Sequence, residues 1–194
     1  RQIVTLTYPH IGNVGVNEND LESNSIKVSG LIVRDFSSHY SNWRSVDSLG
    51  SYLKSNDVVA ISDIDTRRLT RIIREKGALG GCLSTTDVEP DLLVKRAENV
   101  SSLAGQDLAS IASTTEVYRW EEGCCYLGGN EKSSPEKKYT VVAYDYGIKT
   151  NILRLLAERG CSVVVLPART EPSVALSYNP DGIFFSNGPG DPEP

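Results

Sequence analysis

The sequence has 194 residues, 39% of them hydrophobic and 23% charged, with a net charge of −5. This composition is typical of a globular protein that is large enough to bury a core. Acidic and basic residues are mixed along the chain without a basic stripe, so we do not expect a nucleic-acid partner. No apolar run approaches the roughly 18 to 20 residues that span a bilayer, and we expect no membrane partner and a cytoplasmic location.

The four cysteines do not follow the spacing of a cross-linked or metal-binding protein. Cys82, Cys124, Cys125 and Cys161 fit neither a disulfide framework nor a zinc site, and the adjacent pair cannot easily chelate one ion. We therefore expect all four to be reduced and structural, and we expect no metal site.

The first part of the chain predicts strands and helices in mixed order. Strands are expected at residues 25–33, 58–61, 80–83 and 117–120, and helices after a cap at Ser45 and at residues 66–76, 91–98 and 106–112. The second of these helices is the best defined, because Leu69, Ile72 and Ile73 share one face. Asp65 is placed to cap it and Gly77 to end it. The order lacks a clean strand–helix–strand repeat, which indicates a mixed α/β domain.

Residues 129–138 (GNEKSSPEKK) contain no apolar residue and are predicted to form a linker. This places one domain at residues 1–128 and the start of another at residues 139–194. The second part is regular, with strands expected at 140–144, 161–166 and 182–185 and a helix at 148–159. A strand–helix–strand unit of this length predicts a parallel sheet. The predicted fold class is therefore α/β.

A glycine-rich turn, Ser186-Asn187-Gly188-Pro189-Gly190-Asp191-Pro192, follows the last predicted strand. Ligands of parallel sheets bind at the carboxyl ends of strands. The N–H groups of Gly188 and Gly190 are candidate donors to an anion or a developing oxyanion, whereas the prolines donate nothing. The alternative is an ordinary tight surface turn, because Asn-Gly and Pro-Gly are common turn dipeptides.

Four motifs carry a resemblance to a known family. The glycine-rich turn resembles the oxyanion loop of class I glutamine amidotransferases. Residues 142–154 (VAYDYGIKTNILR) resemble the opening strand and helix of that domain in the small subunits of carbamoyl phosphate synthetases. Residues 7–13 (TYPHIGN) and 63–70 (DIDTRRLT) are similar to two stretches of the N-terminal domain of the same subunits. The resemblance covers essentially the whole chain and implies a class I glutamine amidotransferase fold for its second domain.

The resemblance implies a role in a two-subunit ligase. Such a small subunit hydrolyses L-glutamine, and its partner, the large subunit, uses MgATP and bicarbonate to convert the ammonia into carbamoyl phosphate for arginine and pyrimidine synthesis. No cofactor is expected on this chain. Gly188 and Gly190 match the family's glutamine-binding glycines, and Gly188 is the better oxyanion donor.

The family's catalytic triad is not expected within these 194 residues. By the resemblance, the nucleophilic cysteine, the histidine and the glutamate belong to segments beyond Pro194, and a glutamine-binding serine would precede Arg1. We therefore expect both ends of the chain to be cut, and the chain alone to be inactive.

The other reactive or charged side chains have simpler explanations than catalysis or binding. Cys161 opens a strand, and Cys124 and Cys125 lie near the linker, so none is expected to replace the nucleophile. His10 and His39 are expected to be structural or exposed. Another candidate is Lys149, near the end of the first strand of the second domain. A last one is a substrate-binding or docking surface formed by Asp63, Asp65, Arg67, Arg68 and Arg71, which a capped helix with a solvated basic face explains more simply.

Two other functions stay open at this point. One is another class I amidotransferase, against which the N-terminal domain argues. The other is a non-catalytic α/β docking or ligand-binding module, in which the glycine loop holds a phosphate or a carboxylate. Glutamine binding without hydrolysis would favour the docking module.

Overall fold

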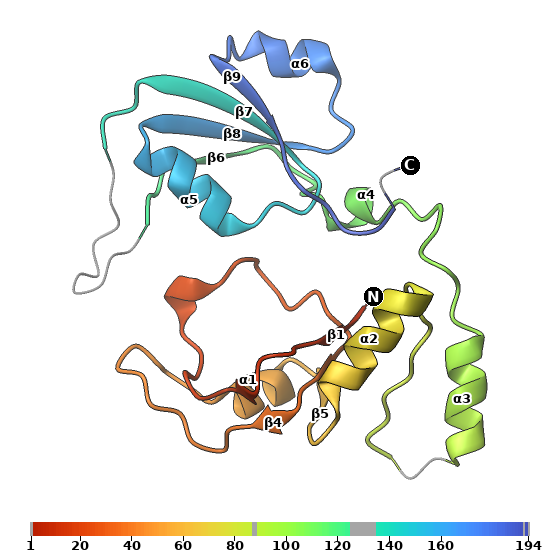
Figure 1. Ribbon diagram of the computed structural model, residues 1–194. Helices are drawn as coiled ribbons and strands as arrows, with labels where there is room; N and C mark the ends of the chain where they lie inside the picture. Colours follow the sequence, from red (N-terminus) through yellow and green to blue (C-terminus); the bar gives the residue numbers. More distant parts are fainter. Residues whose placement is uncertain (1, 87–88, 125–134, 192, 194) are drawn as a thin grey trace. The chain divides into compact units, whose positions relative to one another are not determined.

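The computed structural model describes residues 2–86, 89–124, 135–191 and 193, and the chain divides into two compact units, Arg1–Ser102 and Leu103–Pro194 (Figure 1). Each unit combines helices with a mainly parallel sheet, so the α/β prediction is confirmed. Within the described ranges, every helix is too short or too polar to cross a membrane.

The first unit is built on short parallel strands. One sheet has the order β1-β3-β5 and a second pairs β2 with β4. The strands are β1 (Ile3–Thr5), β2 (His10–Ile11), β3 (Gly30–Ile32), β4 (Asp35–Phe36) and β5 (Val59–Ile61). The helices are the 3₁₀ helix η1 (Glu18–Asp20), α1 (Leu49–Ser55), α2 (Thr66–Lys76) and α3 (Pro90–Glu98). The buried core of this unit is small and centres on Leu31, Val33 and Leu53.

Helix α2 has the bounds that the sequence predicted. The Arg68 N–H donates to Asp65 Oδ1 at 3.0 Å, and Gly77 ends the helix with φ of 81°. The predicted cap of α1 was wrong, because Ser48 rather than Ser45 accepts a hydrogen bond from the N–H of Ser51.

The strand predicted at residues 80–83 does not form. Among the described residues, β1 and β5 are the edges of their sheet, and this segment packs across the sheet instead of extending it. A Cβ added to Gly30 of β3 would lie 2.7 Å from the side chain of Leu83, and one added to Gly80 would meet the carbonyl oxygen of Ala97 in α3. Side-chain packing thus replaces the strand pairing that the sequence pattern suggested.

The second unit has a four-stranded sheet with the order β6-β8-β7-β9. Strand β6 (Tyr118–Trp120) runs antiparallel to β8 (Cys161–Pro167), whereas β7 (Tyr139–Asp145) runs parallel to β8 and to β9 (Gly182–Phe185). The helices are α4 (Leu108–Ala112), α5 (Thr150–Glu158) and α6 (Pro172–Ser177). The predicted parallel sheet is confirmed, with β6 as an antiparallel addition at its edge.

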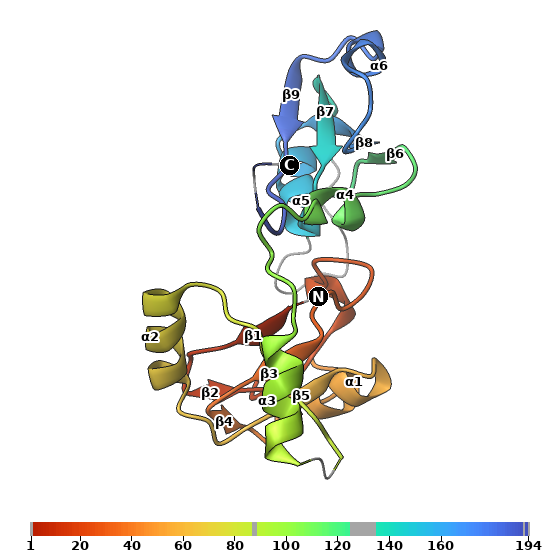
Figure 2. The ribbon, with the colours of Figure 1, turned by 90° about the vertical axis from the view of Figure 1, so that its right-hand side faces the viewer.

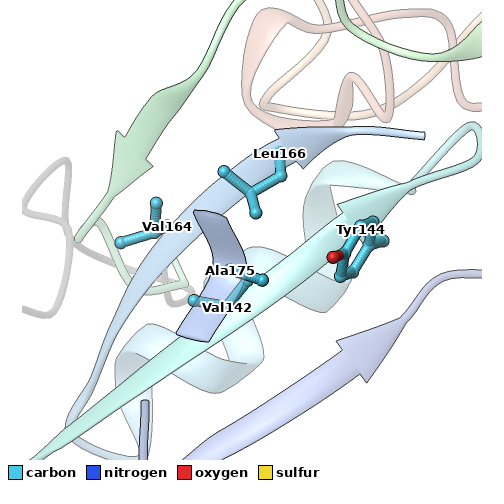
Figure 3. Close-up of a cluster of buried hydrophobic side chains, with 5 residues drawn as sticks. All are labelled: Val142, Tyr144, Val164, Leu166 and Ala175. Atoms are coloured by element: carbon cyan, nitrogen blue, oxygen red, sulfur yellow. The ribbon is translucent and has the colours of Figure 1, made fainter. Parts of the chain in front are cut away.

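Helices cover both faces of this sheet. On one face Val142, Tyr144, Val164 and Leu166 pack against Ala175 of α6 (Figure 3). On the other face Ala143, Cys161, Val163 and Val165 pack against Leu153 of α5. Figure 1 shows α5 and α6 on opposite sides of the strands. Because both faces of β7 and β8 are buried over much of their length, these two strands are largely continuous apolar runs rather than alternating ones.

Along the chain, the first compact unit ends at Ser102 and the second begins at Leu103. The sequence predicted the domain boundary at residues 129–138. The physical reason is β6, whose backbone pairs with β8, so that residues 103–124 belong with the second sheet. Residues 129–134 of the predicted linker lie outside the described residues. Helix α6 was missed because its six residues carry too little apolar pattern to predict a helix.

Candidate functional site

A crevice of about 540 Å³ lies at the carboxyl ends of the parallel strands in the second unit. Helix α4 lies at this end of the sheet, toward which the arrows of β7 and β9 point in Figure 2. The lining residues come from α4, the turn after β7, the end of β8 and the loop after β9: Asp107, Ala109, Ser110, Tyr146, Ala168, Arg169, Ser186, Gly188, Pro189, Gly190 and Asp191. Crevices at this position are the usual ligand sites of open parallel sheets.

A buried carboxylate organises the turn after β7. Asp145 is only 6% exposed, and its Oδ1 accepts hydrogen bonds from the N–H groups of Gly147 and Ile148, both at 2.8 Å. Its Oδ2 accepts a third, from the N–H of Thr114 at 2.7 Å. Three backbone donors satisfy the buried charge, and in return the carboxylate fixes the turn to the segment that follows α4.

A buried hydroxyl organises the start of the glycine loop. Ser186 is 8% exposed, and its Oγ accepts a hydrogen bond from the N–H of Tyr146 and donates one to the carbonyl oxygen of Asn187, both at 2.9 Å. Its own N–H donates to the carbonyl oxygen of Tyr144 at 3.1 Å. The loop after β9 is therefore bonded to the turn after β7 through one side chain.

The two glycines of the loop lie at the crevice, as the sequence predicted for a ligand site. Both are exposed, and within the part of the chain that the structure describes no group accepts a hydrogen bond from either N–H. A Cβ on Gly188 would lie 2.6 Å from the carbonyl oxygen of Tyr146, and one on Gly190, which has φ of 88°, would press on the side chain of Leu108. Glycine is therefore required at position 188 by packing and at position 190 by the backbone conformation. Their role in binding glutamine stays a prediction.

An ion pair holds α4 against the end of β8. The N–H of Ser110 donates to Asp107 Oδ1 at 2.9 Å, and the Arg169 guanidinium donates to Asp107 Oδ2 at 2.7 Å and to the Ser110 hydroxyl at 3.2 Å. Hydrogen bonds from the side chain and the backbone of Ser110, and then from Arg169, lower the pKa of Asp107 from 3.8 to about 2. The carboxylate is thus ionised across the physiological range.

A second carboxylate ties down the far end of the glycine loop. Asp191 Oδ2 accepts from the N–H of Gly105 at 2.9 Å, and its Oδ1 accepts from the N–H of Glu193 at 3.0 Å. These two bonds lower the pKa of Asp191. The loop is therefore anchored at Ser186 and at Asp191, on either side of the two glycines.

The described cysteines are free thiols, as predicted, and the two in the second unit lack the features of a nucleophile. Cys161 is buried in the core beside α5. Cys124 lies 4.0 Å from Asn151 Oδ1, and burial raises the pKa of its thiol, which disfavours the reactive thiolate. Cys125 lies outside the described residues.

The other candidate residues are not among those that line the crevice. In the first unit, His10 Nδ1 lies 2.6 Å from Asp35 Oδ2, and His39 Nδ1 lies 2.9 Å from the Ser38 hydroxyl. Asp65 caps α2, and Lys149 is an exposed residue just before α5. The described ranges contain no cluster of three or more histidine, cysteine or acidic side chains able to hold a metal ion.

The sequence analysis missed Asp145, Ser186, Asp107 and Arg169. Asp107 carried a usable signal, because aspartate directly before a short apolar segment is a helix cap. The roles of the others were not evident, because each also bonds a residue far away in sequence: Asp145 bonds a residue 31 positions earlier and Arg169 one 62 positions earlier.

Comparisons with known proteins agree with this geometry. The family described as "Carbamoyl-phosphate synthase small chain, CPSase domain" matches residues 1–83, and "Glutamine amidotransferase class-I" matches residues 142–194. The chain is 54% identical over its whole length to the "Carbamoyl phosphate synthase small chain" of Pasteurella multocida. It is 55% and 52% identical to the proteins of the same name from Pectobacterium atrosepticum and Ralstonia nicotianae. The chain belongs to the family of carbamoyl phosphate synthase small chains.

Membership of this family covers both units. The first matched range lies in the unit that ends at Ser102, and the second begins within β7 and includes the glycine loop. These matches include 100% of this chain but only 50% to 52% of the length of the three relatives. It thus spans about half the length of the small chains that it matches.

Proposed function

We propose that this chain provides the glutamine-binding and oxyanion-stabilising side of a glutaminase, as part of a carbamoyl phosphate synthase small chain. The observation that carries the proposal is the pair of exposed glycines at positions 188 and 190, which line the crevice and whose N–H groups have no acceptor among the described residues. Donors preorganised in this way stabilise charge that develops on a carbonyl oxygen.

In this proposal the reaction is amide hydrolysis through a thioester. A cysteine thiolate from outside these 194 residues attacks the side-chain amide carbon of glutamine, forming a C–S bond and placing negative charge on the oxygen. The Gly188 N–H donates to that oxygen. The C–N bond then breaks, ammonia leaves with a proton from a general acid, and water releases glutamate from the thioester. Loss of such a donor typically costs about 2.7–4 kcal/mol of transition-state stabilisation.

The wider role is also a proposal and is supported by the names of the relatives. The small chain would pair with a large subunit that binds MgATP and bicarbonate and converts the ammonia into carbamoyl phosphate. The product would serve arginine and pyrimidine synthesis in the cytoplasm. No cofactor is proposed for this chain itself.

We also propose that the 194 residues alone do not hydrolyse glutamine. The cysteine of the second unit that lies in the core, Cys161, is at the end of β8 opposite the crevice. Cys124 has a raised pKa, which opposes nucleophilic attack. Neither can replace a nucleophile at the glycine loop.

The test is glutamate release from L-glutamine by the longer protein that contains this chain, measured with and without its large subunit. We expect hydrolysis by that protein and none by residues 1–194. If the longer protein binds glutamine in a calorimeter but releases no glutamate, the glutaminase proposal fails.

A non-catalytic docking or ligand-binding module is the second candidate. It is favoured by one observation, namely that local structure already requires glycine at both positions, through packing at position 188 and through the backbone conformation at position 190. The same calorimetric experiment separates the candidates, because a docking module predicts saturable binding of glutamine or of another carboxylate without turnover.

A further inference from the structure

The side chain of Ser186 bridges the two segments that form the base of the crevice. Its oxygen accepts the N–H of Tyr146, from the turn after β7, so its own proton is directed elsewhere. That proton is donated to the carbonyl oxygen of Asn187 at 2.9 Å. The side chain is buried, so water does not compete effectively for either bond.

The second of these bonds acts on the peptide group that contains the proposed oxyanion donor. The carbonyl of Asn187 and the N–H of Gly188 belong to one peptide unit, which is planar, and in a trans peptide the two groups point in opposite directions. Fixing the Asn187 oxygen therefore fixes the direction of the Gly188 N–H. Without that bond the unit could rotate more easily, because glycine tolerates many backbone conformations.

We propose that Ser186 is a positioning residue that aims the Gly188 N–H into the crevice. This inference rests on the proposed glutaminase function and adds a residue to it. Ser186 does not touch the substrate in this account. It acts through the Asn187–Gly188 peptide, so its effect should appear in the transition state, where the oxyanion exists, and not in the binding of glutamine.

Ser113 provides a matched control. Its hydroxyl also accepts one backbone N–H, from Ala168 at 2.9 Å, and donates to one carbonyl, that of Thr114 at 3.2 Å. It lies in the same unit but bonds no peptide of the glycine loop. Ser113→Ala and Ser186→Ala therefore remove equivalent hydroxyls, and only the second loosens the peptide of Gly188.

The experiment measures glutamine hydrolysis by the longer protein, assembled with its large subunit, as wild type, Ser186→Ala, Ser186→Thr and Ser113→Ala. Loss of a whole oxyanion donor costs about 10²–10³ in kcat, so a misaimed donor should cost roughly 10-fold, with KM changed by less than about twofold. Ser186→Thr retains the hydroxyl and should restore most of kcat. Ser113→Ala should lower the thermal midpoint to a similar extent without lowering kcat.

Each result decides the question. Equal kcat values for Ser186→Ala and Ser113→Ala overturn the proposal, and so does a Ser186→Ala variant that raises KM at unchanged kcat. If the alanine variant does not fold, a folded Ser186→Thr variant with a 10-fold lower kcat contradicts the account. Absence of hydrolysis by the wild type is a different failure, because it removes the glutaminase function on which the inference rests.

Discussion

The parallel sheets of the two units differ in the length of their strands and in how deeply their side chains are buried. In the first unit the three paired strands have three residues each, and the buried hydrophobic core consists of Leu31, Val33 and Leu53. In the second unit β7 and β8 have seven residues each and lie between two layers of helix, with the side chains of Val142, Val163 and Val164 fully buried.

The polar groups beside the strands differ between the two units in the same way. In the first unit the His10–Asp35 pair is well exposed, with 66% and 54% of the two side chains accessible. In the second unit Asp145 and Ser186 are buried and fully engaged with backbone groups. Because buried hydrogen bonds are screened little by water, a loop held by them keeps a defined shape. The loops of the second unit are therefore suited to holding reactive groups, whereas the exposed His10–Asp35 pair of the first unit lacks this support.

The largest expected difference between the units concerns their cores. Leu153→Ala leaves a cavity beside fully buried neighbours and should cost close to the upper end of the range of about 2–5 kcal/mol in the free energy of unfolding. Leu53→Ala in the first unit should fall near the lower end, since most of its neighbours are only partly buried. Hydrogen exchange during a urea titration reports both units separately. Equal losses would contradict the comparison of the cores.

A smaller effect is expected from the close approach of the glycine loop to its base. Gly188→Ala places a Cβ 2.6 Å from the carbonyl oxygen of Tyr146, a backbone atom that cannot move aside easily. We expect a loss of about 1–3 kcal/mol from overpacking. Gly182→Ala in β9 is the control, since a Cβ there meets nothing within 4 Å. Urea unfolding followed by the fluorescence of Trp120 in a Trp43→Phe background measures both variants. Loss of stability in the control alone would show that the loop is loosely packed.

The smallest effect is expected at Asp107, and it depends on pH. Because folding lowers the pKa of this carboxyl from 3.8 to about 2, its contribution to stability is complete above about pH 4 and is lost as the pH falls through about 2. Asp107→Asn should therefore lower the thermal midpoint at neutral pH, and the difference from the wild type should shrink from about pH 4 to about pH 2. Asp91→Asn, in the first turn of α3, controls for general charge effects. A difference that is independent of pH would exclude the ionised Asp107 carboxylate, with its contacts to Ser110 and Arg169, as its cause.

The fold of the second unit was largely predictable because its strands are continuous apolar runs with helical segments between them. Helix α2 was predictable for a related reason, since its capping residues and its apolar face are local in sequence. The two-residue strands β2 and β4 and the assignment of β6 to the second sheet could not be predicted, because they depend on pairing with distant segments.

The candidate site, like the fold, was predictable only where its pattern is local in sequence. The glycines of the loop were recognisable because a turn after a buried strand has a local pattern. The side chains that hold the loop were not recognisable, since serine and aspartate are common residues whose partners are set only by the fold. Ser186, for example, bonds an N–H that lies 40 positions earlier in the chain.

The account depends most directly on whether glutamine contacts the glycine loop. Hydrogen exchange of the longer protein, with and without saturating glutamine, measures this for peptides that cover residues 185–191. The account predicts slower exchange at Gly188 and Gly190 when glutamine is bound, and unchanged exchange around His10 and Asp35 in the first unit. Protection elsewhere in the protein, with none in the glycine loop, would contradict it.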